Sequence, residues 1–438
     1  MTRIIDAEHN IGIETFFTKT KGIEGKLRTI PEDFIVRERF LYPKQNDNGS
    51  FTIAEVTARN WETNLLLREL ANTLHISRMR IGFAGTKDKR ACSTQLMSFA
   101  NVPPDILAKI NIPDVHIEHI YQSDRQVSIG DLIGNCFDIT IRNIDKKTTS
   151  DQIEKTASQI NSIQGFPNFF GVQRFGIIRP VNHLIGKALL SGNFEQAVMT
   201  YIANPIKGED EKTYILREQL QKTYNFAEAL TSYPPALSFE KAILNRLVVN
   251  PHEFISAFTA LPKNLLTMFI YAYQSYLFNQ ILSERIRQKL PFNQAIEGDV
   301  VLPIRNNTVA EDEHILVNTT NLEKVNMQIK KGKAMISALL VGSDSTFSQG
   351  TMGEIEHHII DKEHIKSQDF IIPELPFLSS SGTRRAILAA VNNLTYTIQN
   401  DEFHPEKQTV KLHFELRKGC YATALLREFM KSTDITSY

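Results

Sequence analysis

A glycine-punctuated turn at residues 82–85 leads into a loop in which one acid is placed among bases. Asp88 follows Lys87 and precedes Lys89 and Arg90. Nearby cations favour the ionised form of a carboxyl group, so we expect Asp88 to be a carboxylate that can attack an electrophile or pair with a base. The same cations could hold phosphates. The competing interpretation is a solvated turn whose charges cancel, because charge runs usually mark exposed surface.

A second segment of unusual composition spans residues 165–176. It holds four phenylalanines, together with Asn168, Gln173 and Arg174, and glycines frame it. Aromatic faces stack on bases, amide side chains hydrogen-bond to base edges, and arginine pairs with phosphate, so the composition suits a nucleotide pocket. The alternative is a core-facing turn whose aromatic side chains simply pack.

The charge balance limits where a polyanion could bind. The chain has 49 basic and 49 acidic residues and a formal net charge of zero, so a polyanion site must be a local patch. The densest basic cluster surrounds Asp88 and consists of Arg78, Arg80, Lys87, Lys89 and Arg90. This cluster predicts contacts with a phosphate backbone, and such binding would depend on salt.

Several common catalytic motifs are missing from the sequence. Residues 82–87 lack the GxxxxGK[ST] spacing of a phosphate-binding loop, no GxGxxG follows a predicted strand, and no serine lies in a GxSxG. Acids and histidines gather at residues 354–364 but lack the HExxH order of a zinc site, so a solvated helix is expected there. These absences disfavour nucleotide hydrolysis, dinucleotide binding and serine-hydrolase chemistry.

The cysteines and the hydropathy pattern indicate the compartment. Cys92, Cys136 and Cys420 are far apart and lack metal-ligand spacing, which argues against a disulfide framework or structural zinc and fits a reducing cytoplasm. The first residues contain acids and lead into no apolar run, unlike a signal peptide. No window approaches the roughly 18 apolar residues that a membrane span needs. We therefore expect a cytoplasmic protein without a membrane partner.

The pattern of elements predicts that both ends of the chain form one domain. At 438 residues, two or three domains are expected. Residues 25–142 show strands and helices, with a period-two strand around residues 137–142, and the last sixty residues return to this mixed texture. The intervening chain becomes helical beyond Pro180 and then strand-rich around residues 299–317. A separate domain inserted into an α/β domain explains this order.

Taken together, these segments resemble the TruD family of tRNA pseudouridine synthases, most closely its archaeal members. The matches extend over most of the chain and keep the order of the family. They lie at residues 31–38, from the Asp88 turn through Gln95, and at 134–137, 168–176, 274–279, 298–299, 382–386 and 418–423. Any one match would be weak, whereas eight in order are specific.

The resemblance implies an α+β fold. A pseudouridine-synthase catalytic domain with a mixed, mainly antiparallel sheet would comprise residues 1–185 plus 371–438. It would be interrupted by an inserted α/β TRUD domain at residues 186–370. The family implies tRNA as the partner, no cofactor or metal, no evident protein partner, and a monomer.

The resemblance also implies roles for individual residues. In this family the aspartate of the Gly-x-Lys-Asp motif, here Asp88, is the catalytic carboxylate. The Asn-x-Phe-Gly segment lines the active site, with Asn168 near that carboxylate and Phe170 against the target uracil, and Arg28 stands where some relatives carry lysine. The expected substrate-binding residues are Arg28, Glu38, Lys87, Asn168, Phe170 and Arg174. The expected contacts to the RNA backbone are Arg78, Arg80, Lys89, Arg90 and Arg384.

The implied reaction is the isomerisation of uridine to pseudouridine, at uridine 13 in the D arm of tRNA. The glycosidic bond breaks, the uracil turns within the pocket, and a carbon–carbon bond forms between C5 and C1′. The target base must leave its stack before the carboxylate can reach it. Asp88 could attack covalently or deprotonate the ribose at C2′, and both routes stay open. The alternatives are the same chemistry at another RNA site, or an RNA-binding protein without catalysis.

Overall fold

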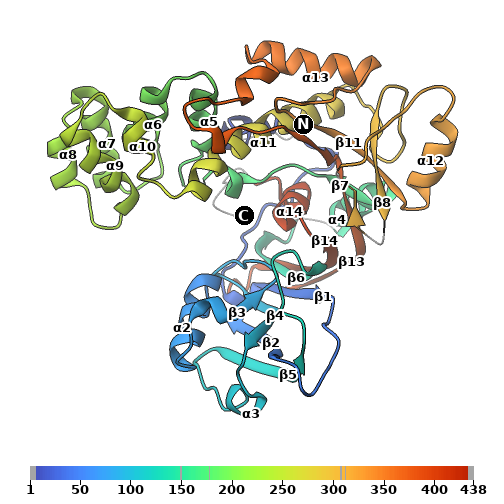
Figure 1. Cartoon of the computed structure of the whole chain (residues 1–438). Helices are drawn as coiled ribbons and strands as arrows, with labels where there is room; N and C mark the ends of the chain where they lie inside the picture. Colours follow the sequence, from blue (N-terminus) through green and yellow to red (C-terminus); the bar gives the residue numbers. More distant parts are fainter. Residues whose placement is uncertain (1–5, 148–149, 177, 306–307, 311, 433–438) are drawn as a thin grey trace. The chain divides into compact units, whose positions relative to one another are not determined.

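A computed structural model describes residues 6–147, 150–176, 178–305, 308–310 and 312–432, in which the chain forms two compact units (Figure 1). The first unit combines Thr18–Phe166 with the chain from Ala389 onward. The second unit combines Pro167–Leu388 with the N-terminal segment up to Phe17. The chain passes from one compact unit to the other near residues 166 and 388, whereas the domain boundaries expected from the sequence are at 185 and 371. The division into a catalytic and an inserted domain stays a prediction.

A nine-stranded sheet forms the centre of the first unit. Its strands run in the order β5-β2-β4-β1-β6-β14-β13-β7, and β3 pairs with β4. β1 and β4 are parallel, whereas the pairs β1–β6, β2–β4, β2–β5, β3–β4, β6–β14 and β13–β14 are antiparallel. The prediction of a mixed, mainly antiparallel sheet is confirmed. The strands are β1 (Phe34–Phe40), β2 (Phe51–Arg59), β3 (Ile81–Phe83), β4 (Cys92–Ala100), β5 (Val115–Ser123), β6 (Leu132–Asp145), β7 (Gly165–Pro167), β13 (Leu388–Asn400) and β14 (Lys407–Arg417).

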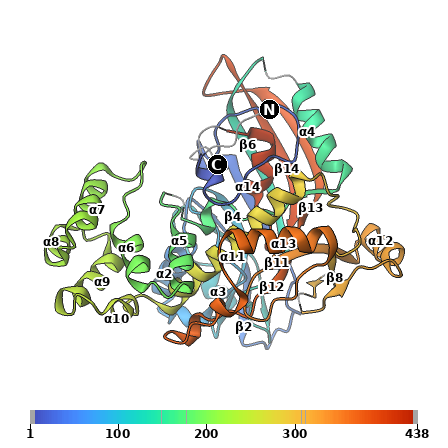
Figure 2. The ribbon, with the colours of Figure 1, turned by 90° about the horizontal axis from the view of Figure 1, so that it is seen from above.

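Four α-helices accompany this sheet in the described part of the first unit: α2 (Thr63–Thr73), α3 (Pro104–Leu107), α4 (Ser150–Ser162) and α14 (Ala422–Met430). Figure 2 shows α4 and α14 beside β6, β13 and β14. Alternate residues of β6, such as Phe137 and Ile139, are buried in one cluster with Ile153 of α4 and Leu425 of α14. The period-two pattern read from the sequence therefore identifies the face of the strand that the helices cover.

The two ends of the chain meet in this sheet. β14 pairs with β6 along nearly its whole length, from Lys407 opposite Asp145 to Arg417 opposite Gly134. At the centre of this pairing Phe414 stacks on Phe137 with 5.1 Å between ring centroids. The strands after residue 388 therefore belong to the same sheet as β1 and β6.

The second unit has a helical part and a part built on a smaller sheet (Figure 1). The long helix α11 (Lys263–Arg287) contacts α5, α13 and β11 and is buried along much of its length. The other helices are α1 (Asp6–His9), α5 (Asn182–Leu190), α6 (Phe194–Ala203), α7 (Glu211–Thr223), α8 (Phe226–Ser232), α9 (Ser238–Val249), α10 (Phe254–Phe258), α12 (Leu322–Lys330) and α13 (Gly350–Lys362).

The smaller sheet runs in the order β10-β8-β11-β12, with β9 paired to β8. All of these pairings are antiparallel. The strands are β8 (Val300–Arg305), β9 (Thr308–Val309), β10 (Ile315–Leu316), β11 (Ala334–Leu340) and β12 (Thr383–Ala386). Together the two units give the α+β class expected from the sequence. Among the described residues, no helix combines the length and the hydropathy needed to cross a bilayer.

Candidate active site

Asp88 lies in the loop between the antiparallel strands β3 and β4. Its side chain is 59% exposed, and its Oδ2 accepts a hydrogen bond from Nη2 of Arg28 at 2.7 Å. The Arg28 side chain is only 13% exposed. The loop therefore exposes a carboxylate to solvent, and a mostly buried cation pairs with one of its oxygens.

The backbone around Arg28 is tightly constrained. Arg28 has φ +54°, a left-handed conformation that costs a residue with a Cβ on the order of 1 kcal/mol. The neighbouring Lys26 exchanges backbone hydrogen bonds with Arg142, and the Arg142 guanidinium donates to Asp33 at 2.7 Å. These contacts anchor the chain on both sides of Arg28. A strained residue that fixes a charged side chain is typical of functional sites.

The guanidinium of Arg28 lies 4.0 Å from the centre of the Phe34 ring. Burial lowers the pKa of Arg28, and the negative charge of Asp88 opposes this shift. An arginine keeps its proton at physiological pH even so. Arg28 is therefore a fixed positive charge that orients one oxygen of Asp88.

Lys87 is directed away from Asp88. Its ammonium group is hydrogen-bonded to Glu38 Oε1, and both side chains are buried, with exposed fractions of 9% and 0%. The second oxygen of Glu38 accepts from the amide of Leu96 at 3.2 Å, and the Lys87 amide donates to Thr63 Oγ1 at 2.7 Å. The structure thus brings Lys87 to Glu38 rather than to Asp88, and this pair fixes the path of the loop.

The basic cluster around Asp88 is not uniform. Lys89 and Arg90 are exposed, and so is Arg78, which donates to Asn64 Oδ1 at 2.6 Å. Arg80 is half-buried and donates to the backbone oxygen of Ala100 at 2.9 Å. Lys89 and Arg90 are therefore the members of the cluster most accessible to a phosphate beside Asp88.

In the second unit, Asn168 is buried with every polar group of its side chain engaged. Nδ2 donates to the oxygen of Ala386 at 2.9 Å, and Oδ1 accepts from Nη2 of Arg385 at 2.8 Å. The Asn168 amide also donates to the oxygen of Ile387 at 2.8 Å. Because one end of the side chain faces a carbonyl and the other an arginine, the orientation of the amide group is unambiguous.

Phe170 is 3% exposed and is held by α11. Its amide donates to Asn279 Oδ1 at 2.9 Å, and Asn279 Nδ2 donates to the Phe170 oxygen at 3.0 Å. The ring meets the edge of Phe278 with 5.5 Å between centroids. Both the backbone and one side of the ring are thus fixed by the helix.

Two guanidinium groups lie near the ring of Phe170. The Cζ atom of Arg385 is 4.2 Å from its centroid, and that of Arg174 is 5.3 Å away. Sequence reasoning identified Arg174 but missed Arg385, although the matched segment 382–386 contains it. Asn168, Phe170 and Arg174 therefore do come together, with Arg385 as a fourth member.

The burial of Arg384 disfavours the expected contact of this residue with RNA. Successive residues of a strand point to opposite faces, and the Arg384 side chain is 1% exposed on the face opposite to that of Arg385. Arg384 is ion-paired with the buried Glu356 of α13 at 2.7 Å and donates to Ser348 Oγ at 2.8 Å. Its guanidinium joins β12 to α13 and is enclosed by protein.

One group of possible metal ligands lies among the described residues, and it lies outside the predicted site. The ligand atoms of Glu55, Glu118 and His119 are within 4.8 Å of one another on strands β2 and β5. Glu55 already accepts from the Tyr42 hydroxyl at 2.7 Å, and its Oε1 lies 3.0 Å from Nδ1 of His119. The protein itself therefore satisfies the most buried of these ligands.

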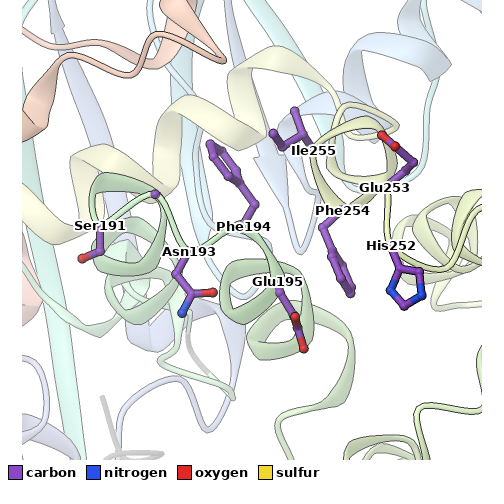
Figure 3. A pocket seen from close by; sticks show the side chains of 9 residues that line it. Ser191, Asn193, Phe194, Glu195, His252, Glu253, Phe254 and Ile255 are labelled. Carbon is purple, nitrogen blue, oxygen red and sulfur yellow. The ribbon is translucent and has the colours of Figure 1, made fainter.

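A surface hollow of about 410 Å³ lies among helices α5, α6 and α10 of the second unit (Figure 3). Glu195, His252 and Glu253 are its charged or titratable side chains, and the described residues that line it include no lysine or arginine. An acidic lining disfavours a phosphate backbone. The hollow contains none of the predicted site residues.

Comparison with known proteins identifies the wider group of this chain. A family model described as tRNA pseudouridine synthase D (TruD) matches residues 10–429. A relative from Methanosarcina barkeri, named "Probable tRNA pseudouridine synthase D", is 42% identical, and the match covers 98% of each chain. A relative of the same name from Pyrococcus abyssi is 35% identical over 95% of this chain and 98% of its own.

A solved structure shares the fold. The crystal structure of a protein described as tRNA pseudouridine synthase D (TruD) from Methanosarcina mazei aligns with a TM-score of 0.90. The two chains are 39% identical, and the alignment covers 99% of this chain and 100% of the other. The likeness therefore extends over both compact units.

Proposed function

The chain belongs to the TruD family of tRNA pseudouridine synthases, and on that premise we propose that Asp88 is the catalytic carboxylate that converts uridine 13 of tRNA to pseudouridine. The observation that carries this proposal is the exposed carboxylate held by a single, mostly buried arginine. Glycosidic chemistry at C1′ needs such an oriented carboxylate.

The two oxygens of Asp88 have different tasks in this proposal. Oδ2 is bonded to Arg28, whereas Oδ1 has no hydrogen-bond partner among the residues that the structure describes. Oδ1 is therefore available either to attack C1′ or to take the proton from C2′. Both routes break the bond from C1′ to N1 and form the bond from C1′ to C5, after which C5 releases its proton to solvent and N1 gains one.

Asn168 and Phe170 provide the chemistry to hold an extruded uracil. Phe170 offers an aromatic face, and Asn168 Oδ1 is an acceptor that suits the N3–H donor of uracil. Stacking on an aromatic ring contributes about 1–3 kcal/mol per base, and edge hydrogen bonds add selectivity. The exposed Lys89 and Arg90 supply cations for phosphates next to the target nucleotide.

The substitution Asp88→Asn tests the catalytic assignment. It keeps the size of the side chain but removes the nucleophilic or basic oxygen, so turnover should fall by about 10⁴-fold or more while tRNA still binds. Tritium release from C5-labelled uridine in tRNA measures turnover directly. The matched control is Asp114→Asn, which alters another exposed aspartate near an arginine of the same unit and should leave turnover unchanged. Turnover in Asp88→Asn comparable to the control would refute the assignment.

The target position needs its own measurement. Pseudouridine mapping of tRNA treated with the protein should show modification at position 13, and a transcript with cytidine at position 13 should release no tritium. Pseudouridine at another position, with position 13 unmodified, would keep the chemistry but refute the proposed target.

A further inference from the structure

The guanidinium of Arg385 makes the two contacts that the proposed function assigns to uracil. Its Cζ lies 4.2 Å from the centre of the Phe170 ring, and its Nη2 donates to Asn168 Oδ1 at 2.8 Å. A guanidinium is planar, stacks on aromatic faces and donates N–H groups in its plane. Uracil is also planar and donates through N3–H. The guanidinium therefore lies over Phe170 and beside Asn168 Oδ1, in the kind of position that a bound uracil would take.

Among the described residues, several neighbours enclose the ring of Phe170. The side chain is 3% exposed, the edge of Phe278 packs against it, and Asn279 fixes its backbone through two hydrogen bonds. Its second cation, Arg174, lies 5.3 Å from the ring centre. A base can stack on Phe170 only if one of its neighbours moves.

Arg385 combines a fixed backbone with a long side chain. Its backbone is fixed in β12, where it pairs with Ala338 of β11, but its long side chain can change rotamer without disturbing the strand. Phe278 and Asn279, in contrast, are fully buried in α11. The adjacent Arg384 is ion-paired with the buried Glu356 on the other face of β12.

We infer that Arg385 is a gate that mimics the base: it occupies the uracil site of the substrate-free protein and withdraws when the extruded uridine enters. This inference rests on the proposed function of Asn168 and Phe170. A gate of this kind lowers the apparent affinity, because only the open fraction of the protein can accept the base. It also favours uracil over cytosine, since the N3 atom of cytosine carries no hydrogen and cannot replace the donor of Arg385 at Asn168 Oδ1.

A fluorine label on Phe170 tests the gate without relying on turnover. 4-Fluorophenylalanine is placed at position 170 of the full chain, and its ¹⁹F resonance is compared in the free protein with Arg385 intact and with Arg385→Ala. The substitution should uncover the ring, shift the resonance and increase its response to exchange of H₂O for D₂O. The control Arg305→Ala removes an exposed arginine from β8 of the same sheet and should change neither property. If Arg385→Ala matches this control, the inference is wrong.

The tRNA complex provides the second part of the test, in the Asp88→Asn background so that bound tRNA is not converted. Binding should move the resonances of the proteins with and without the Arg385→Ala substitution to a common position, and Arg385→Ala should bind tRNA about tenfold more tightly. Weaker binding by Arg385→Ala would instead make Arg385 a substrate contact and overturn the gate.

The variant Arg385→Lys tests the role of the planar group, and separate readouts distinguish a failure of the gate from a failure of the proposed function. Arg385→Lys keeps the charge but loses the planar group, so a folded Arg385→Lys protein should resemble Arg385→Ala in the ¹⁹F spectrum. A failure of the proposed function would appear as residual tritium release by Asp88→Asn or as the absence of tRNA binding. The comparison of the free proteins depends on neither result and tests whether Arg385 covers Phe170, whereas the tRNA complex tests whether Arg385 withdraws.

Discussion

The Asp88 loop and the segment at residues 165–176 are both glycine-framed and both predicted to contact the target nucleotide, but the structure treats them in opposite ways. Asp88 is 59% exposed and held by one ion pair. Phe170 is 3% exposed, and the neighbouring Asn168 uses both polar ends of its side chain on protein partners. The carboxylate proposed to act in the reaction is thus open to solvent, while the side chains proposed to bind the base are enclosed.

This difference separates two physical requirements. A carboxylate that must be ionised gains from solvent and from a nearby cation, and burial would disfavour its charge. A stacking surface for a base gains from a rigid, apolar environment, and exposure of an aromatic ring to water would weaken it. Each region therefore has the environment that its proposed task requires, and substitutions can test each region separately.

After the loss of Asp88 itself, the largest effect is expected from removing the Arg28 cation that is paired with it. Arg28→Ala should lower the rate of a single turnover by about 10³-fold, because the carboxylate loses its orienting donor. Arg28→Lys should recover part of the rate, since it keeps the charge but not the geometry. The matched control is Arg59→Ala, which breaks an exposed pair with Glu32. Equal rates for Arg28→Ala and the control would show that the ion pair has no part in the reaction.

The stability of the second unit should depend on pH through the buried His183. His183 stacks on Tyr276, with 5.0 Å between ring centroids, and packs against the edge of Phe175. Burial lowers the pKa of His183 to about 4, from 6.5 in an unperturbed histidine. The unfolded chain therefore binds more protons between these values. The stabilising contribution is complete above pH 6.5 and is lost as the pH falls through 4.

The free energy of unfolding of the second unit should accordingly fall by about 3 kcal/mol between pH 7 and pH 4 on account of His183 alone. Urea denaturation across this range measures the effect. His183→Asn should flatten the dependence, whereas substitution of the exposed His116 by Asn should not. An unchanged slope in His183→Asn would mean that His183 does not titrate as a buried group.

The next effect tests whether the enclosed ring serves the reaction or only the fold. Phe170→Ala should lower kcat by about 10²-fold and weaken tRNA binding only a few-fold, because most of the affinity comes from the phosphate backbone. Single-turnover rates and filter binding of tRNA measure the two quantities. Equal losses in rate and affinity, or loss of the folded state, would make Phe170 a structural residue.

The smallest effects are expected at the exposed cations of the Asp88 loop. Lys89→Ala and Arg90→Ala should each weaken tRNA binding a few-fold and reduce the slope of the salt dependence by about one. The control Lys155→Ala removes an exposed lysine of α4 that is paired with Asp151. A salt slope unchanged from that of the unsubstituted protein would place the phosphates elsewhere.

Sequence reasoning was strongest where a pattern has a direct physical meaning. The alternation at residues 137–141 identified a strand of the larger sheet, and the loop position of Asp88 followed from its glycines and charges. The return to mixed texture near the C-terminus indicated one domain built from both chain ends, and in the structure β14 pairs with β6. Each of these features depends on neighbouring residues or on a short period.

The partners of individual charges could not be predicted in the same way. Lys87 is separated from Glu38 by 49 residues, and Arg384 is separated from Glu356 by 28. The choice between Arg384 and Arg385 depends on the phase of a four-residue strand, because a shift by one residue exchanges the two faces. Two adjacent arginines offer no local signal that tells the buried structural one from the one beside Phe170.

Because the last strands complete the larger sheet, this sheet can finish folding only at the end of synthesis. During synthesis the ribosome delivers β1 and β6 first, then the whole of Pro167–Leu388, and only afterwards the residues of β13 and β14. The second unit can therefore fold on a nascent chain while β6 still lacks its neighbour. A message truncated before residue 388 would yield Asp88 on an unfinished sheet with an unpaired, aggregation-prone edge.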